Sequence, residues 1–297
     1  MKIGFIHQGG ATFASYRFRA AIPAKGLERL GHSVCINQGE ADIFVFSKPM
    51  LNDYEIAEDV KNQGARVVFD VVDDHLTHPI FGPIYNKMIE LADVLVSPTQ
   101  NMAERVYRVS GRTPIVIPDP YEEEKQQPHA TGDKLLWFGH RTNLKDLAPW
   151  KPYLNGITIL TGPNIHEPVA IKAGKKLAQT QSINVLDGRT YLEWSLEAQT
   201  REFTNHNIVV IPTHQGAEYK SANRLVNAVR GGCFVVCSPH PSHEEFRSMA
   251  WVGNIKTGVD WARAFENELN DRVTEAQAYV EKFSPDAVAK LWEGALQ

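Results

Sequence analysis

The sequence contains little cysteine and no long apolar run. Its cysteines, at positions 35, 233 and 237, fit neither a disulfide framework nor a zinc site, and their apolar surroundings favour buried free thiols. No segment approaches the roughly 20 apolar residues that a membrane span needs. Residues 1–7 are too briefly apolar for a signal peptide. The sequence therefore predicts a cytoplasmic protein without a membrane span.

The sequence also lacks a strong excess of charge and two common phosphate-binding motifs. The formal net charge is −4, all of it contributed by residues 1–130. Proteins that bind nucleic acid usually carry a positive surface, so a nucleic-acid partner is an alternative that the charge does not favour. Neither the G-x-G-x-x-G dinucleotide fingerprint nor a Walker loop is present.

Short runs rich in Val, Ile and Phe alternate with helical patterns along the chain. Continuous apolar runs of this length are typical of strands buried on both faces of a parallel sheet. They predict strands at residues 2–7, 32–37, 42–47, 66–72, 93–97, 113–117, 134–138, 157–161, 183–186, 207–211, 233–237 and 251–255.

Helical periodicity fills the gaps between these runs. Apolar residues share one face in 81–92 and in 99–110, where Gly111 is placed to end the helix. Ser284 and Pro285 give the last helix a cap and a first-turn proline. Two successive sets of β/α units predict an α/β fold of two doubly wound, Rossmann-like domains, joined by the polar stretch 121–133.

In such folds ligands bind beyond the carboxyl ends of the strands, so the polar residues there are the candidates for a site. After the first strand, Gly9 and Gly10 let the backbone approach a ligand, and the following helix offers its N-terminus to an anion. Ser15, Arg17 and Arg19 extend this acceptor or phosphate loop, although both arginines could equally be solvated.

After the fourth strand stand Asp73, Asp74 and His75, which could form a general-base cluster. The alternative is a helix cap with solvated neighbours. No further ligand has convincing spacing, so we expect no metal here.

Two groups in the second half suit a diphosphate. The first follows the seventh strand and gathers a glycine, an amide and protonatable or cationic groups: Gly139, His140, Arg141, Asn143 and Lys145, with Pro212 after a later strand. The second and stronger group places four donors at a helix N-terminus: Lys220, Ser221, Asn223 and Arg224.

With these motifs in this order, the sequence resembles the GT-B glycosyltransferases, in particular the retaining family-4 type (glycosyl transferases group 1) and its small phage and bacterial relatives. The resemblance is carried by residues 15–19, 23, 27–32, 69–75, 136–140, 143, 211–212, 220–224 and 279–285.

The resemblance implies an acceptor-side domain at 1–128, a nucleotide-sugar domain at 129–278 and a C-terminal helix, 279–297, that packs back on the first domain. The donor would be a UDP-sugar, with a GDP-sugar as the alternative, and its base would dock near residues 185–194. Retention of configuration is implied, and neither a cofactor nor a metal is required. The acceptor would be a glycan, a lipid-linked saccharide or another hydroxyl compound.

The sequence departs from the family at its Glu-x7-Glu motif, where Tyr219 and Asn227 stand in the places of the two glutamates and Glu218 is out of register. The donor's identity therefore stays open. If the reaction inverted configuration, Asp73, Asp74 or His75 would serve as the base.

Three other functions stay open: a phage-type transferase that glycosylates hydroxymethylated DNA bases, a sugar-nucleotide-binding protein without turnover, and a nicotinamide-dependent oxidoreductase. The missing fingerprint and the donors at 220–224 argue against the last.

Overall fold

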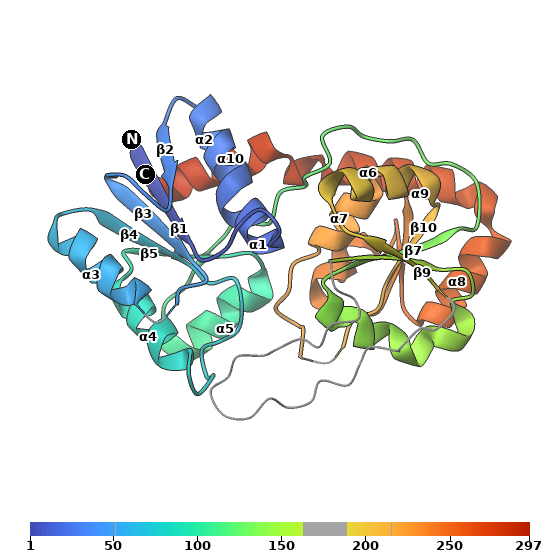
Figure 1. The fold of residues 1–297 in the computed structure, drawn as a ribbon, viewed down its shortest axis with the longest axis horizontal. Coiled ribbons are helices and arrows are strands. Elements are labelled where there is room, and N and C mark those ends of the chain that lie inside the picture. Colours follow the sequence, from blue (N-terminus) through green and yellow to red (C-terminus); the bar gives the residue numbers. More distant parts are fainter. Residues whose placement is uncertain (51, 163–188, 215) are drawn as a thin grey trace. The chain divides into compact units, whose positions relative to one another are not determined.

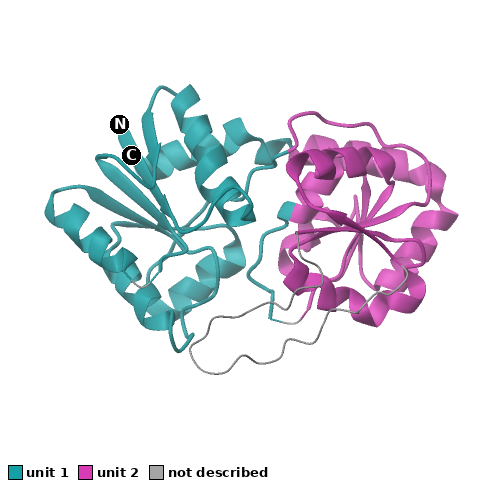
Figure 2. Cartoon of the chain, viewed as in Figure 1, with its two compact units in different colours: residues 1–122, 216–223, 281–297 teal, residues 123–215, 224–280 magenta. Residues whose placement is uncertain are grey.

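The computed structural model describes residues 1–50, 52–162, 189–214 and 216–297. They form two compact units, coloured separately in Figure 2. Unit 1 comprises Met1–Glu122, Gly216–Asn223 and Glu281–Gln297, and unit 2 comprises Glu123–Gln215 and Arg224–Val280. Residues 216–223 thus pack with unit 1, although the sequence placed them within the second domain.

Unit 1 is built on a parallel sheet with the strand order β2-β1-β3-β4-β5-β6 (Figure 1). Its strands are β1 (Lys2–His7), β2 (Ser33–Ile36), β3 (Ile43–Ser47), β4 (Arg66–Asp70), β5 (Val94–Ser97) and β6 (Ile115–Val116). Because β2 and β3 lie on opposite sides of β1, the order of strands reverses between β1 and β3. A doubly wound sheet opens a crevice for ligands at such a switch point.

Helices cover both faces of the unit 1 sheet. One face packs against α2 (Ile22–Arg29) and α10 (Pro285–Leu296), and the other against α3 (Asp53–Asn62), α4 (Gly82–Leu91) and α5 (Gln100–Ser110). Short turns of helix complete the unit: α1 (Ala14–Tyr16), η1 (Arg17–Ala21) and η4 (Glu281–Phe283).

The C-terminal helix α10 packs on the N-terminal unit, as the fold prediction required. Ser284 caps it by accepting a hydrogen bond from the Ala287 amide. Trp292 is fully buried, and its ring lies 5.8 Å from that of Phe5 in an edge-to-face arrangement. This burial joins the last residues of the chain to its first strand.

Unit 2 repeats the plan, with the parallel strand order β12-β11-β10-β7-β8-β9. Its strands are β7 (Leu135–Gly139), β8 (Thr158–Thr161), β9 (Thr190–Glu193), β10 (Ile208–Ile211), β11 (Phe234–Cys237) and β12 (Trp251–Val252). Here the order of strands reverses between β7 and β10, which sets the switch point of this sheet.

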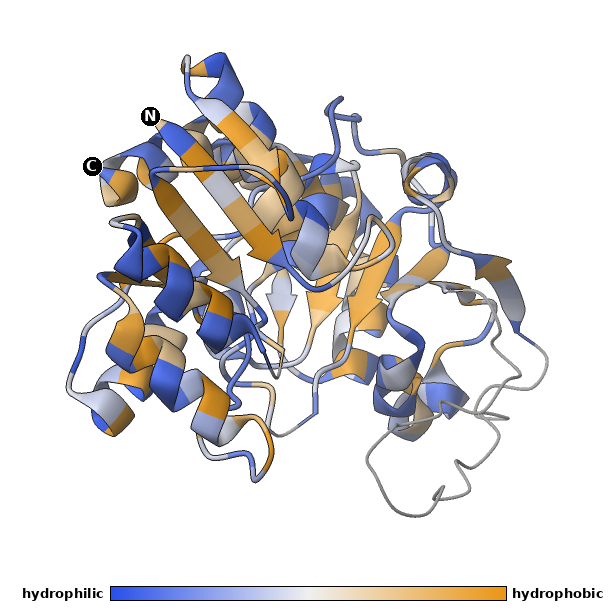
Figure 3. Ribbon diagram, turned by 60° about the vertical axis from the view of Figure 1, so that its left-hand side comes forward, coloured by the Kyte–Doolittle hydropathy of each residue, from blue (hydrophilic) through white to orange (hydrophobic). Residues whose placement is uncertain are grey.

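Helices also flank the unit 2 sheet. The core on one face joins η2 (Arg141–Tyr153), α8 (Ile255–Ala264) and α9 (Glu266–Val280) to the strands. The remaining helices of the described residues are α6 (Leu196–Asn205), α7 (Asn223–Arg230) and η3 (Pro241–Phe246). Figure 3 shows the pattern behind this layering: the strands are mostly hydrophobic, whereas the helices also carry hydrophilic residues.

The structure confirms the prediction of two doubly wound parallel sheets. Gly111 ends α5 in the left-handed conformation, with φ of 71°, as its position predicted. The predicted strand 183–186 lies outside the described residues. Strand β9 at 190–193 was not predicted, because its sequence TYLE lacks the apolar run that marks the other strands.

Candidate functional site

The candidate donor site of unit 2 lies where β7 and β10 end, at the switch point of the sheet. Gly139 closes β7, and a Cβ there would lie 3.4 Å from Nη1 of Arg224 and 3.4 Å from the indole of Trp137. Glycine therefore leaves room for the guanidinium at the strand end. Arg224 is in the first turn of α7, where the helix dipole favours an anion.

The guanidinium of Arg224 is buried, and the described residues do not fully compensate its charge with hydrogen bonds or an ion pair. Its Nη1 is buried and has no hydrogen-bond partner among the described residues. Burial lowers the pKa of Arg224 to about 10, although Asp146 and Cys237 partly oppose that shift. Withdrawing a guanidinium from water is costly unless an anion and hydrogen bonds replace the water. An anionic ligand would supply the compensation that Arg224 lacks among the described residues.

Thr213 and Trp137 also carry buried hydrogen-bond donors near the ends of β7 and β10. The hydroxyl of Thr213, which follows β10, and the indole Nε1 of Trp137 in β7 are both buried with no partner among the described residues. Native proteins satisfy nearly all buried polar groups, so such orphans commonly mark a place where a ligand binds.

A buried histidine lies close to this arginine without adding a charge. Burial, reinforced by His240 and Arg224, lowers the pKa of His243 to about 4. The ring Nδ1 lies 3.1 Å from the carbonyl of Ser238, an arrangement in which it donates. A neutral His243 adds no positive charge next to Arg224.

The other residues predicted for a diphosphate in unit 2 cluster after β7 and β10. His140 caps η2 by accepting from the Thr142 amide at 3.4 Å. The remaining members lie in η2 or directly after β10: Arg141, Asn143, Lys145 and Pro212. Of these, Lys145 is exposed.

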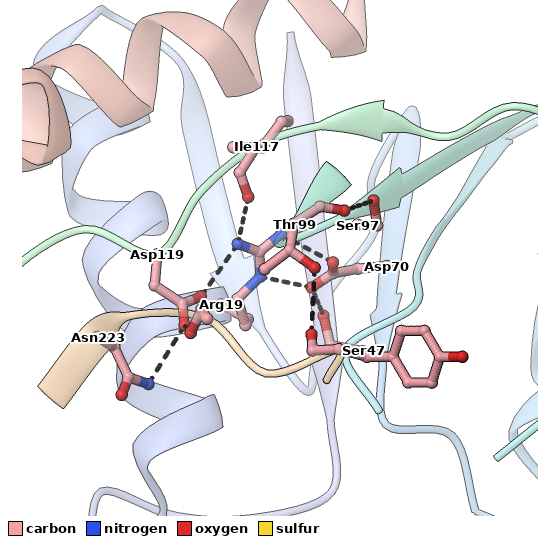
Figure 4. Close-up of polar contacts among 10 residues, drawn as sticks. Arg19, Ser47, Asp70, Ser97, Thr99, Ile117, Asp119 and Asn223 are labelled. Carbon is pink, nitrogen blue, oxygen red and sulfur yellow. Dashed lines mark hydrogen bonds and ion pairs between the residues drawn. The ribbon is translucent and has the colours of Figure 1, made fainter. Parts of the chain in front are cut away.

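Lys220, Ser221 and Asn223 are occupied by carboxylates of unit 1. Lys220 forms an ion pair with Asp73. Ser221 donates to Asp119, and the amide of Asn223 donates to the same carboxylate at 3.3 Å (Figure 4). These carboxylates take the bonds that the sequence assigned to phosphate oxygens.

Arg19 corrects a prediction made from the sequence. Its side chain is fully buried, and it donates to both oxygens of Asp70 at 2.9 and 2.8 Å. It also donates to the carbonyl of Ile117 at 2.7 Å and to Asp119 at 3.2 Å (Figure 4). A guanidinium engaged in this way is not available to a phosphate or an acceptor.

The rest of the predicted loop after β1 is arranged differently. Arg17 forms a two-pronged ion pair with Glu122, at 2.6 and 3.2 Å. Gly9 lies against the ring of His7, Gly10 faces open space, and Ser15 is half-buried in α1.

The predicted catalytic residues line a cavity of about 190 Å³ in unit 1, together with Val72, Met102, Gly216, Ala217, Tyr219 and Lys220. Although burial would raise the pKa of Asp73, the ammonium groups of Lys220 and Lys48 hold it well below its usual range. Asp74 accepts from Arg105 at 3.0 Å, and burial lowers the pKa of His75. A carboxylate stabilised by two lysines is a poor proton acceptor.

Several site residues escaped the sequence analysis. Lys48 and Asp119 were not predicted, because their partners are distant in sequence. His7 was not predicted either, and its position as the last residue of the first strand was the available signal. Tyr219 and Asn227 stand in the places of the two glutamates of the family motif. Tyr219 packs against the unit 1 core, and Asn227 is buried in α7.

The sequence matches no protein-family model and no curated protein. Its structure is similar to solved structures along the whole chain. HepE from Anabaena, solved with UDP and glucose, has a TM-score of 0.71 at 13% identity, covering 100% of this chain and 99% of that chain. An alpha-glucosyltransferase in complex with UDP has a TM-score of 0.69 at 10% identity, covering 100% of both chains.

An alpha-glucosyltransferase bound to UDP and a 13-mer DNA with an HMU base is also similar, with a TM-score of 0.69 at 11% identity over 100% of this chain and 99% of that chain. These neighbours are GT-B glycosyltransferases. The chain has the GT-B fold. At these identities the likeness establishes the fold, and the chemistry has to be argued from the residues.

Proposed function

We propose that this GT-B protein is a glycosyltransferase that moves a sugar from a UDP-sugar to a hydroxyl acceptor. The observation that carries the proposal is Arg224, a buried guanidinium with an unpartnered Nη1 at the switch point of unit 2. A nucleoside diphosphate supplies the anion that this environment lacks. UDP is favoured over GDP because several neighbours of the same fold were solved with UDP.

In the proposed reaction the bond between the sugar's anomeric carbon and the diphosphate breaks, and a bond to the acceptor oxygen forms. The acceptor's proton passes to an oxygen of the departing diphosphate. Arg224 and the N-terminus of α7 stabilise the negative charge that develops on that group. Because these protein groups supply positive charge, the proposal calls for no metal.

We further propose that the configuration of the sugar is retained. Inversion needs a protein base, and the two carboxylates predicted as candidates are poorly suited to that role. Asp73 is stabilised as an anion by two lysines, and Asp74 is paired with Arg105. Retention through the leaving diphosphate avoids the need for either carboxylate.

Unit 1 would supply the acceptor side, and a DNA base carrying a hydroxymethyl group is one candidate acceptor because a neighbour was solved with such DNA. The negative charge balance of residues 1–130 favours an acceptor other than DNA.

None of the helices in the described residues is long and apolar enough to cross a membrane. We place the protein in the cytoplasm because its three cysteines are free thiols.

The test is thermal unfolding of the purified protein with UDP, UDP-glucose, GDP, GDP-glucose and NAD(P). A ligand that binds the folded state raises the unfolding midpoint by mass action. We expect UDP and UDP-glucose to raise it, and Arg224→Ala to abolish the rise. The proposal would be contradicted if only NAD(P) raised the unfolding midpoint, or if none of these nucleotides raised it.

Turnover is tested separately, by following the release of UDP from UDP-glucose. Release that depends on Arg224 supports an enzyme. UDP-glucose that binds and stays intact with every acceptor offered, including DNA carrying an HMU base, would instead indicate a sugar-nucleotide-binding protein.

A further inference from the structure

His7 is the last residue of β1 and lies at the switch point of the unit 1 sheet. It is in register with Ser47, the last residue of β3, so it occupies the place where a doubly wound sheet opens for a ligand. The side chain is 2% exposed. Both ring nitrogens are buried and have no hydrogen-bond partner among the described residues.

The strand itself does not require an imidazole at this position. The backbone amide of His7 donates to the side chain of Asn37 at 2.8 Å, and its carbonyl accepts from the same side chain at 3.0 Å. An apolar residue could keep both of these bonds. Two unpaired ring nitrogens in the interior make the folded state less stable, so the histidine needs another explanation.

The charges around His7 keep its ring neutral. Burial, reinforced by Lys48, lowers the pKa of His7 to about 4. Lys48 has a φ of 53° and is held by an ion pair with Asp73 at 2.8 Å. Lys220 pairs with the same carboxylate. A neutral imidazole has one N–H and one lone pair, so it can both donate and accept.

Gly9 lies directly against the ring of His7. A Cβ on Gly9 would lie 3.3 Å from Nδ1 and Cε1 of His7 and 3.3 Å from the ring of Phe13. A side chain at position 9 would therefore crowd the imidazole.

We propose that His7 and Lys48 form a subsite for the hydroxyl groups of a sugar acceptor. Hydroxyl groups match a ring that must donate at one nitrogen and accept at the other. Lys48, with a side chain 35% exposed, donates to a further oxygen. His7 is thus a substrate-binding residue of unit 1, and this assignment rests on the proposed transferase function.

The test uses glucose as the probe, with the full-length protein carrying ¹⁵N-labelled histidine. We expect glucose to shift the His7 ring nitrogen resonances in a saturable way. The resonances of His78, an exposed histidine, serve as the internal control. His7→Phe is expected to weaken glucose binding, measured by calorimetry, about tenfold, because one to two hydrogen bonds are lost.

Stability separates a binding role from a structural one. Replacing the unpartnered imidazole of His7 by phenylalanine should raise the thermal midpoint. The matched control is His206→Phe, since His206 is also buried but its Nδ1 lies 2.8 Å from the Glu202 carbonyl. That variant should lower the midpoint. If His7→Phe is not properly folded, His7→Gln, which keeps one polar end, is titrated instead.

Unmoved His7 resonances at saturating glucose, or unchanged glucose affinity in the variant, would overturn the subsite. A UDP titration of the same protein distinguishes this result from failure of the transferase proposal. UDP affinity depends on unit 2, so protein that binds UDP but shows no glucose effect at His7 retains the transferase proposal and loses only the subsite.

Discussion

Arg19 and Arg224 both carry guanidinium groups withdrawn from water, and they differ in what surrounds them. Arg19 is surrounded by Asp70, Asp119 and a backbone carbonyl, so its charge is compensated within unit 1. Nη1 of Arg224 has no such partner among the described residues. The charge of Arg19 is therefore compensated within the protein, whereas we propose that a ligand compensates the charge of Arg224.

This difference at Arg19 predicts a large effect on stability. Arg19→Met leaves Asp70 buried and unpaired, and should lower the free energy of unfolding by about 3–5 kcal/mol. Arg29→Met removes an exposed ion pair with Asp286 and should cost less than about 1 kcal/mol. Urea unfolding followed by circular dichroism measures both. Equal losses in the two variants would contradict the proposed role of Arg19.

The helix α10 shows how local sequence signals and packing agree. Its start is readable from Ser284 and Pro285, because capping chemistry depends on adjacent residues. Its partners are not readable in the same way, since Trp292 contacts Phe5 at the opposite end of the sequence.

Adjacent residues of α10 predict contrasting mutational effects. Trp292→Ala removes a fully buried side chain between the helix and the sheet, and should cost about 3–5 kcal/mol. Leu291 is 46% exposed, so Leu291→Ala should lower the free energy of unfolding by about 0.5 kcal/mol or less. Thermal unfolding of both variants is the measurement. A Trp292→Ala protein as stable as Leu291→Ala would show that α10 does not hold unit 1 together.

The segment 216–223 marks the limit of what the sequence could predict. Its donors at a helix N-terminus were recognisable from the sequence, and Arg224 follows directly after it. The partners of Lys220 and Ser221, however, are Asp73 and Asp119, more than 100 residues away. Local pattern identifies which groups can donate, and only the fold determines which acceptors reach them.

For the whole molecule, two buried histidines, His7 in unit 1 and His243 in unit 2, predict a shared dependence on pH. His7 and His243 have a pKa of about 4 in the folded protein, against 6.5 for an ordinary histidine. Between these values the unfolded chain binds more protons, so the free energy of unfolding should fall as the pH decreases from 6.5 to 4. Each histidine contributes at most about 3 kcal/mol.

Urea unfolding across this pH range tests that prediction. His7→Phe should reduce the slope, and the reduction should come from the transition of unit 1. A free energy of unfolding that does not change between pH 6.5 and 4 would mean that these histidines are not neutral and buried.

The strand pattern predicted two parallel sheets, because apolar runs reflect burial directly. The pattern could not predict that the guanidinium of Arg224 lacks a full set of partners, because that depends on every group around this side chain in the folded protein. Gly139 illustrates this limit: it was recognised as a loop glycine, while its role in making room for Arg224 required the structure.

The central claim, that unit 2 holds a nucleoside diphosphate on Arg224, is tested most directly by calorimetric titration of UDP. The wild-type protein should bind UDP, and Arg224→Met should weaken binding by about 30-fold or more, because a charged hydrogen-bonding partner of the diphosphate is lost. The same variant should unfold at an equal or higher temperature, since it no longer buries an uncompensated charge. UDP binding of equal strength in Arg224→Met, or none in the wild type, would contradict the account.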